Sequence, residues 1–167
     1  FFFKQKTAYE IKECDWSSDV CSSDLDVAVA TINSTGLVTG VAAGTATITY
    51  TDINGCQDTQ LVTVNALPVI SGTASVCVGL TTQLSGTGSP AATGAWNTSS
   101  AAVATVSSTG LVTGVSAGTA TVTYTDINGC QDTQLVTVNA LPVISGTASV
   151  CVGLTTQLTG TGTPAIS

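Results

Sequence analysis

The chain of 167 residues contains no His and no Met, and charged residues of any kind make up only 8% of it. Its three basic residues are all Lys and lie within the first 25 residues, as do both Glu and all three Phe. After Leu25 the only charged side chains are five Asp, which give residues 26–167 a formal charge of −5. Because nucleic acids and anionic membranes attract basic surfaces, we expect neither as a partner.

The same scarcity of titratable groups argues against catalysis. General acid–base and nucleophilic mechanisms place a group such as His, Glu, Asp, Lys or Cys beside the reacting atoms. A Ser or Thr nucleophile in residues 26–167 would have no partner base except loop carboxylates. We therefore expect no enzyme activity and no cofactor. No apolar run approaches the roughly 18 residues of a membrane span, so we expect no membrane insertion either.

Residues 1–25 differ in composition from everything that follows. The segments KQKTAYEI (residues 4–11) and WSSDVCSSDL (residues 16–25) resemble conceptual translations of the adapters ligated to DNA for short-read sequencing. We interpret residues 1–25 as an adapter-derived artefact that forms no domain, so Cys14 and Cys21 carry no functional weight. A genuine N-terminal arm is the alternative.

The remainder of the chain is a tandem repeat with a period of 74 residues. Residues 29–91 and 103–165 differ at only six positions, and each difference is mild, such as Ile48 against Val122. A unit of this length is too long for one solenoid turn and suits one small sandwich domain.

The segment ALPV occurs at residues 66–69 and 140–143 and is the natural linker, because Pro stiffens the junction and donates no hydrogen bond to a sheet. This division predicts one complete domain at residues 67–140. Residues 26–66 would then be the C-terminal half of an earlier repeat, and residues 141–167 the N-terminal part of a further repeat.

Strand patterns dominate the repeat. Residues 118–125, GTATVTYT, alternate strictly, with Ala120, Val122 and Tyr124 on one face. The segment DINGC then leads to TQLVTV at residues 133–138, and its Asn-Gly pair predicts a hairpin with a type I′ turn. SSTGLVTGV predicts a second hairpin with Gly110 at its turn, and LTTQLSG at residues 80–86 predicts a further strand. About seven short strands with closely spaced turn signals predict an all-β fold of tandem Ig-like β-sandwiches.

Several blocks of the repeat are similar to bacterial immunoglobulin-like domains of group 2. They are CVGLTTQLSGTG, AWNTSS, AAVATVSSTGLVTGVSAGTATVTY and LVTV, and they follow one another in the family's order and spacing. The resemblance covers nearly all of residues 26–167. It implies tandem domains of bacterial surface proteins related in architecture to the invasin and intimin adhesins. The cysteine placement is also similar to Ig-like repeats of Bacteroidetes extracellular proteins.

Candidate core residues follow from the sandwich interpretation. Trp96 fits the usual aromatic of strand C, which fills the space between the two sheets. We expect it to pack in the core with Leu84, Val122 and Tyr124. Stacking of Trp96 against a sugar is the alternative role.

Each repeat carries two Cys, Cys77 and Cys130 in the complete domain, without the His or CxxC spacing of a metal site. We predict a Cys77–Cys130 disulfide, whose closed loop would contribute roughly 4 kcal/mol in the chain-entropy model. A Cys56–Cys77 bridge across the ALPV junction and free buried thiols are the alternatives. The partners of Cys56 and Cys151 would lie in truncated parts. Evenly repeated Cys fits an oxidising compartment, which indicates an extracellular or bacterial cell-surface location.

The loop TDINGCQD supplies the only candidate metal ligands. Oxygen atoms of Asp126, Asn128 and Asp132 suit Ca²⁺, whereas an Asx-rich turn explains the same residues without metal. The leading functional hypothesis is a non-catalytic stalk or spacer in adhesion, whose expected partners are the neighbouring Ig-like repeats of the same chain. The alternatives are a module that binds a host or matrix glycan or protein, with calcium stabilisation, and an accessory domain of a secreted enzyme.

Overall fold

The computed structural model describes residues 15–16, 19–20, 26–33 and 35–162, and these residues form β-strands, turns and loops. The chain divides into two compact units, residues 1–67 and residues 68–167, which are treated separately below. Within the described ranges no helix is long and apolar enough to cross a membrane.

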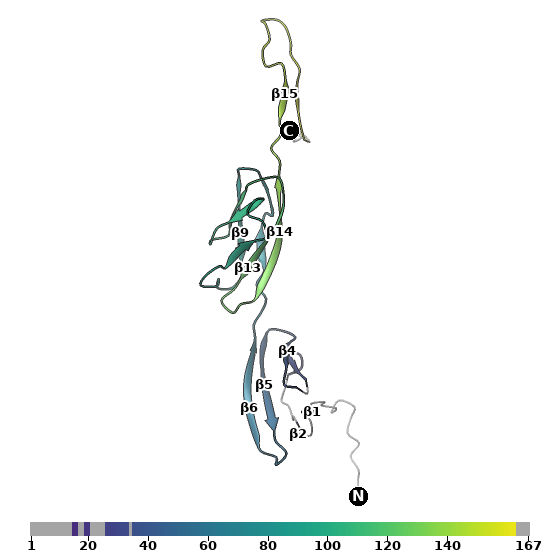
Figure 1. Ribbon diagram of the computed structural model, residues 1–167, viewed down its shortest axis with the longest axis vertical. Helices are drawn as coiled ribbons and strands as arrows, with labels where there is room; N and C mark the ends of the chain where they lie inside the picture. The colour runs from purple at the N-terminus through teal and green to yellow at the C-terminus, as the bar shows by residue number, and fades with distance from the viewer. Residues whose placement is uncertain (1–14, 17–18, 21–25, 34, 163–167) are drawn as a thin grey trace. The chain divides into compact units, whose positions relative to one another are not determined.

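The second unit contains two four-stranded sheets (Figure 1). In the first sheet the strands lie in the order β10-β13-β14-β8, and in the second sheet in the order β11-β12-β9-β7. The strands of the first sheet are β8 (Ser75–Cys77), β10 (Trp96–Thr98), β13 (Gly118–Thr125) and β14 (Gln131–Asn139). Those of the second sheet are β7 (Ile70–Gly72), β9 (Thr81–Gly86), β11 (Ala104–Val106) and β12 (Leu111–Gly114). The all-β Ig-like sandwich expected from the sequence is confirmed.

The alternation of residues along β13 determines which of its faces becomes core. Ala120, Val122 and Tyr124 are at most 2% exposed, while the intervening Thr side chains are half-buried on the other face. Successive side chains of a strand point to opposite faces, so this pattern directs one row of apolar groups toward the second sheet.

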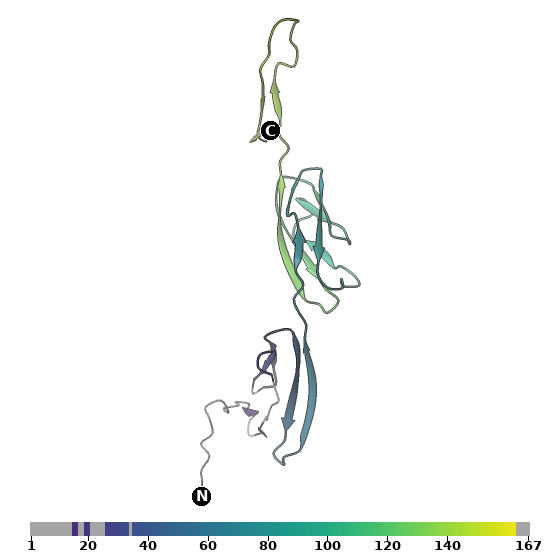
Figure 2. The same ribbon diagram turned by 180° about the vertical axis from the view of Figure 1, so that it is seen from behind.

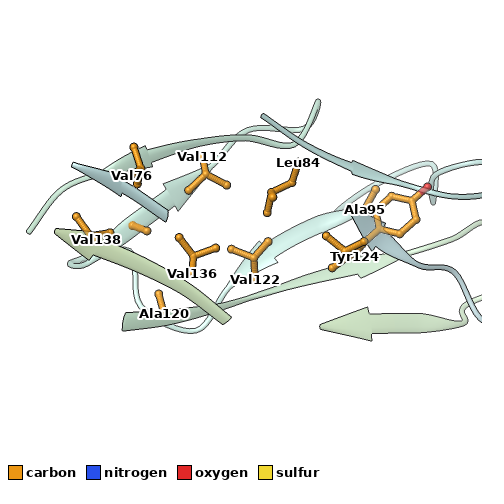
Figure 3. Close-up of a cluster of buried hydrophobic side chains, with 11 residues drawn as sticks. Val76, Leu84, Ala95, Val112, Ala120, Val122, Tyr124, Val136 and Val138 are labelled. Carbon is orange, nitrogen blue, oxygen red and sulfur yellow. The ribbon is translucent and has the colours of Figure 1, made fainter. Parts of the chain in front are cut away.

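The core lies between the two sheets and is built mainly from Val and Ala. In Figure 3, Val112 and Leu84 from the second sheet point toward Val136 and Val122 from the first. These four are the largest side chains that the structure buries completely. Every residue of the buried cluster lies between Ile70 and Val138, so residues 67–140 contain their own core.

The predicted hairpins are present, but the turn of one differs from the expected type. β13 and β14 pair in register, from Gly118 opposite Val138 to Thr125 opposite Gln131. The N–H of Gly129 donates to the carbonyl of Asp126, so the tight turn spans residues 126–129 and the Asn-Gly pair is not its central pair. The type I′ prediction is therefore wrong, because a five-residue connection replaces the two-residue loop.

In the second hairpin β11 and β12 pair antiparallel. Gly110 lies at the turn with φ of +83°. The strand predicted at residues 80–86 begins one residue later, at Thr81. Leu80 precedes β9 and is exposed, whereas Leu84 within the strand is fully buried.

The first unit repeats part of this arrangement, and so do residues 141–162, which we call the tail. In the first unit, strand β5 (Gly44–Thr51) pairs with strand β6 (Gln57–Val64). The register is that of β13 and β14, with every residue number lower by 74. The other pairs of the first unit are β3 (Ala30–Ile32) with β4 (Val38–Gly40), and β1 (Asp15–Trp16) with β2 (Asp19–Val20). In the tail, β15 (Ile144–Gly146) pairs with β16 (Leu158–Gly160) as β7 pairs with β9.

Most of the segment interpreted as adapter-derived lies outside the described residues. Only the short strands β1 and β2 of that segment are described, and Cys14 and Cys21 are not. The artefact interpretation of residues 1–25 and the domain bounds remain predictions.

Candidate functional site

The loop between β13 and β14 contains the only buried charged side chain among the described residues, Asp126, which is 6% exposed. Its Oδ1 atom accepts the backbone N–H groups of Asn128 at 2.9 Å and Cys130 at 2.8 Å. The backbone N–H of Asp126 also donates to the carbonyl of Cys130 at 2.9 Å. A buried carboxylate that satisfies two backbone donors closes the loop and offsets the cost of its own burial.

The Asp132 carboxylate accepts hydrogen bonds from outside this loop. Its Oδ2 accepts the N–H of Ile70 at 2.7 Å, and its Oδ1 accepts the N–H of Thr133 at 2.8 Å. The first of these bonds joins β14 to the start of β7, 62 residues earlier in the chain. No local sequence pattern relates Asp132 to Ile70, so the sequence alone does not predict this connection.

The proposed calcium ligands are therefore all engaged in hydrogen bonds with other groups of the protein. Asp126 binds backbone groups of its own loop, Asp132 binds Ile70, and the Asn128 amide nitrogen lies 3.4 Å from Asp126 Oδ2 as a donor. Over the described part of the chain, no group of three or more His, Cys, Asp or Glu could hold a metal ion. The geometry is that of the Asx turn, in which these oxygens accept N–H groups.

The equivalent loop of the first unit shows the electrostatic effect of this arrangement. Backbone N–H donation from Cys56, at 2.7 Å, is the main cause that lowers the pKa of Asp52, and donors of Asn54 add to it. Burial acts in the opposite direction. Since the fold favours the ionised form, the stabilisation that this carboxylate gives is present above its unfolded pKa and is lost as the pH falls through the lowered folded pKa.

Three of the four candidate core residues are buried, and the fourth, Trp96, is only half-buried. Leu84 and Val122 are fully buried and Tyr124 is 2% exposed, whereas Trp96 is half-buried at the edge strand β10. The Trp96 and Tyr124 rings lie 4.7 Å apart between centroids with an interplanar angle of 48°. The Tyr124 hydroxyl donates to the carbonyl of Gly88 at 3.2 Å.

Trp96 also borders an open depression of about 370 Å³. Other residues that line it include Ser85, Pro90 and Tyr124. The indole therefore contributes to both the margin of the core and a surface hollow. An aromatic ring beside polar groups is a common element of ligand sites, although this hollow is shallow and lacks charged groups.

The two thiols of the complete repeat lie at opposite ends of it. Cys77 is the residue opposite Asn139, the last residue of β14, in the parallel pairing of β8 with β14. Cys130 immediately precedes Gln131, the first residue of that strand. Nine residues of strand separate the two ends, about 30 Å at 3.3 Å per residue.

The predicted Cys77–Cys130 disulfide is therefore wrong. The α-carbons of a disulfide lie about 4.4–6.8 Å apart, and the structure leaves Cys77 and Cys130 as free, half-buried thiols. Their sequence spacing allowed a bridge, but the parallel placement of β8 beside β14 puts one at each end of the sandwich.

We call the end with Ile70 and Cys130 the N-terminal pole, and the end with Cys77 and Asn139 the C-terminal pole. The chain enters the complete repeat at the N-terminal pole and leaves it at the C-terminal pole. Cys77 thus lies at the pole away from the first ALPV segment. The alternative Cys56–Cys77 bridge is not formed either, because both cysteines are free thiols. Figure 2 shows β14 continuing directly into the segment that leads to the tail.

The chain matches one family model twice. The family is described as "Bacterial Ig-like domain (group 2)", and the matches cover residues 5–64 and 63–138. The first match begins at residue 5, inside the segment of residues 1–25 that we interpret as adapter-derived.

One similar protein is Ice-binding protein 1 of Shewanella frigidimarina (strain NCIMB 400), which is 32% identical over 173 aligned residues. The alignment covers 89% of this chain, but the chain spans only 18% of that relative's length.

Two solved structures are also similar to this chain. The C-terminal fragment of intimin, in complex with the intimin-binding domain of its translocated receptor, is 18% identical with a TM-score of 0.46. That likeness covers 67% of this chain and 45% of the fragment. Domains 4 and 5 of the S-layer protein SbsC are 24% identical with a TM-score of 0.33, covering 78% of this chain and 74% of that one.

Proposed function

The chain belongs to the bacterial Ig-like domain family, group 2, and we propose that its repeats are non-catalytic spacers in a stalk of a bacterial surface or secreted protein. The observation that carries the proposal is the placement of the two poles. The chain enters the complete repeat beside Asp132 and leaves it after Asn139, at opposite ends of the nine-residue strand β14. A unit with this path adds length each time it is repeated.

The side chains of the repeat support a structural role. Its charged groups are Asp alone, and the Asp126 and Asp132 carboxylates accept backbone N–H groups. The near identity of consecutive repeats also suits a spacer, which needs only continuity.

The location follows from composition and family. Residues 26–167 carry Asp but no basic residue, which keeps an exposed array soluble and away from nucleic acid. The resemblance to tandem domains of bacterial surface proteins supports a place outside the cytoplasm.

Small-angle X-ray scattering of chains that contain one, two and three copies of residues 67–140 tests the spacer proposal. We expect the maximum dimension to rise by a constant increment for each added copy, of about 30 Å or more, set by the length of β14. A maximum dimension that stays nearly constant from one to three copies would overturn the proposal, because the repeats would then fold back on one another.

A second candidate function is ligand binding at the depression beside Trp96. Its support is the half-buried indole and the neighbouring polar groups, which resemble a sugar-stacking platform. Trp96 is the only Trp of residues 67–140, so its fluorescence reports directly on this surface. A glycan array followed by fluorescence titration tests this second function, and thermal unfolding with calcium or with a chelator tests its calcium dependence. If no glycan binds and the melting temperature is the same in calcium and in chelator, the ligand-binding function is contradicted.

A further inference from the structure

Each complete repeat carries one thiol at each pole, and each thiol is fixed to the strand that defines its pole. The N–H of Val78, next to Cys77, donates to the carbonyl of Asn139 at 3.0 Å. Cys130 ends the Asp126 loop, and two residues later Asp132 holds the start of β7 at Ile70. The thiols therefore mark the two places at which a repeat joins its neighbours.

The period of the sequence determines what meets at a junction between two complete repeats. The preceding repeat contributes its Cys77 at the C-terminal pole. The following repeat contributes the counterpart of Cys130 at its N-terminal pole, beside the counterpart of Ile70. In the present chain that counterpart of Ile70 is Ile144, which has the same strand register.

The linker between the two poles of a junction is short. Asn139 lies beside Cys77 at the usual strand spacing of about 4.8 Å, and Ile144 follows five residues later, at most about 17 Å away along the chain. The counterpart of Cys130 lies two residues before the Asp that binds the Ile144 position, on the side from which the linker arrives. A disulfide between them requires the linker to bend until the two α-carbons lie within about 6.8 Å of each other.

We propose that consecutive complete repeats are joined by a disulfide between Cys77 of one repeat and the counterpart of Cys130 in the next. The proposal rests on the spacer function, to which it adds a covalent link parallel to each Pro-containing linker. Formation of the S–S bond removes two protons and two electrons from the thiols. A disulfide oxidant, such as glutathione disulfide, accepts them and becomes two thiols.

A chain of two copies of residues 67–140 tests this link, because all strands and the buried cluster of a repeat lie within those residues. The junction variant carries Cys130→Ser in the first copy and Cys77→Ser in the second, so only the two junction thiols remain. The matched control carries Cys77→Ser in the first copy and Cys130→Ser in the second, which leaves the two outer thiols.

Both variants are incubated with glutathione disulfide and reduced glutathione, the monomer is isolated, and free thiols are counted by mass after alkylation. We expect the junction variant to lose both thiols to an intramolecular disulfide, and the control to keep both. The unsubstituted two-copy chain should fall from four free thiols to two. Retention of both thiols in the junction variant, or equal oxidation of both variants, would overturn the proposal.

Scattering of the same samples separates this inference from the spacer function. Free junction thiols in a two-copy chain that still lengthens by a constant increment would contradict the disulfide alone. A disulfide in a chain that does not lengthen would contradict the spacer function. Circular dichroism confirms that each variant keeps its β-structure, and the unsubstituted chain gives the answer if a Ser variant does not fold.

Discussion

Asn33 and Ser107 occupy equivalent positions of two repeats and make the same hydrogen bonds with different side chains. Asn33 Oδ1 accepts the N–H of Leu37 at 2.9 Å, and Ser107 Oγ accepts the N–H of Leu111 at 3.1 Å. Both residues favour turns because a short polar side chain can accept backbone N–H groups nearby. The substitution between the repeats therefore preserves the acceptor and with it the turn.

Asp126 is the residue whose loss should affect the β13–β14 loop most. Asp126→Ala leaves the N–H groups of Asn128 and Cys130 without their acceptor, and we expect the free energy of unfolding of residues 67–140 to fall by about 2 kcal/mol. Asp126→Asn, which keeps an acceptor oxygen, should cost less. Urea unfolding measures both changes, and an alanine variant as stable as the parent would show that the loop closes without this carboxylate.

Leu84 and Leu135 provide a direct test of which face of each strand is core. Leu84 is fully buried and Leu135 is 56% exposed. Leu84→Ala should lower the free energy of unfolding by about 3 kcal/mol, through lost burial and the cavity it leaves. Leu135→Ala should change it by less than about 0.5 kcal/mol. Chemical denaturation of the two variants compares them, and similar losses would mean that the assigned faces are wrong.

At the scale of elements, two turn glycines share a backbone conformation but differ in their surroundings. Gly110 and Gly129 both have φ of +83°. A Cβ on Gly110 would collide with the Leu84 carbonyl oxygen and lie 3.0 Å from the Trp96 ring, whereas a Cβ on Gly129 meets nothing within 4 Å. The turn between β11 and β12 is therefore packed against β9 and the Trp96 ring, whereas the tip of the other hairpin is open.

We expect the alanine variants of these two glycines to separate backbone strain from crowding. Gly129→Ala should cost about 1 kcal/mol, the ordinary penalty of a positive φ for a residue with a side chain. Gly110→Ala should cost at least twice as much, because the Leu84 strand and Trp96 must also move. Thermal unfolding gives the stabilities, and Trp96 fluorescence should change in the Gly110 variant only; equal losses would contradict the close packing.

Sequence patterns were informative where the deciding interactions are local. The alternation in residues 118–125 gave the bounds and buried face of β13, and Gly110 marked a turn that the structure contains. The relation of Cys77 to Cys130 depends instead on β8 pairing in parallel with β14, a contact between segments about 60 residues apart. Neither spacing nor composition contains that information, and the same holds for the bond from Ile70 to Asp132.

At the scale of the molecule, nearly identical segments of consecutive repeats differ in burial. Ile70 is 8% exposed in the complete repeat, while its counterpart Ile144 in the tail is 73% exposed. Leu84 and Leu158 differ in the same direction, at 0% and 47%. The strand pairing of β7 with β9 and of β15 with β16 is the same. Local sequence thus forms the hairpins, and burial requires both sheets of one repeat.

Hydrogen exchange of residues 67–140, alone and within the full chain, tests most directly whether one repeat is a self-contained two-sheet sandwich. We expect the paired amides of β13 and β14 to be protected to the same degree in both samples, because every residue of the buried cluster lies inside this range. Exchange at the rate of an unfolded chain in the isolated repeat, with protection restored in the full chain, would contradict the account.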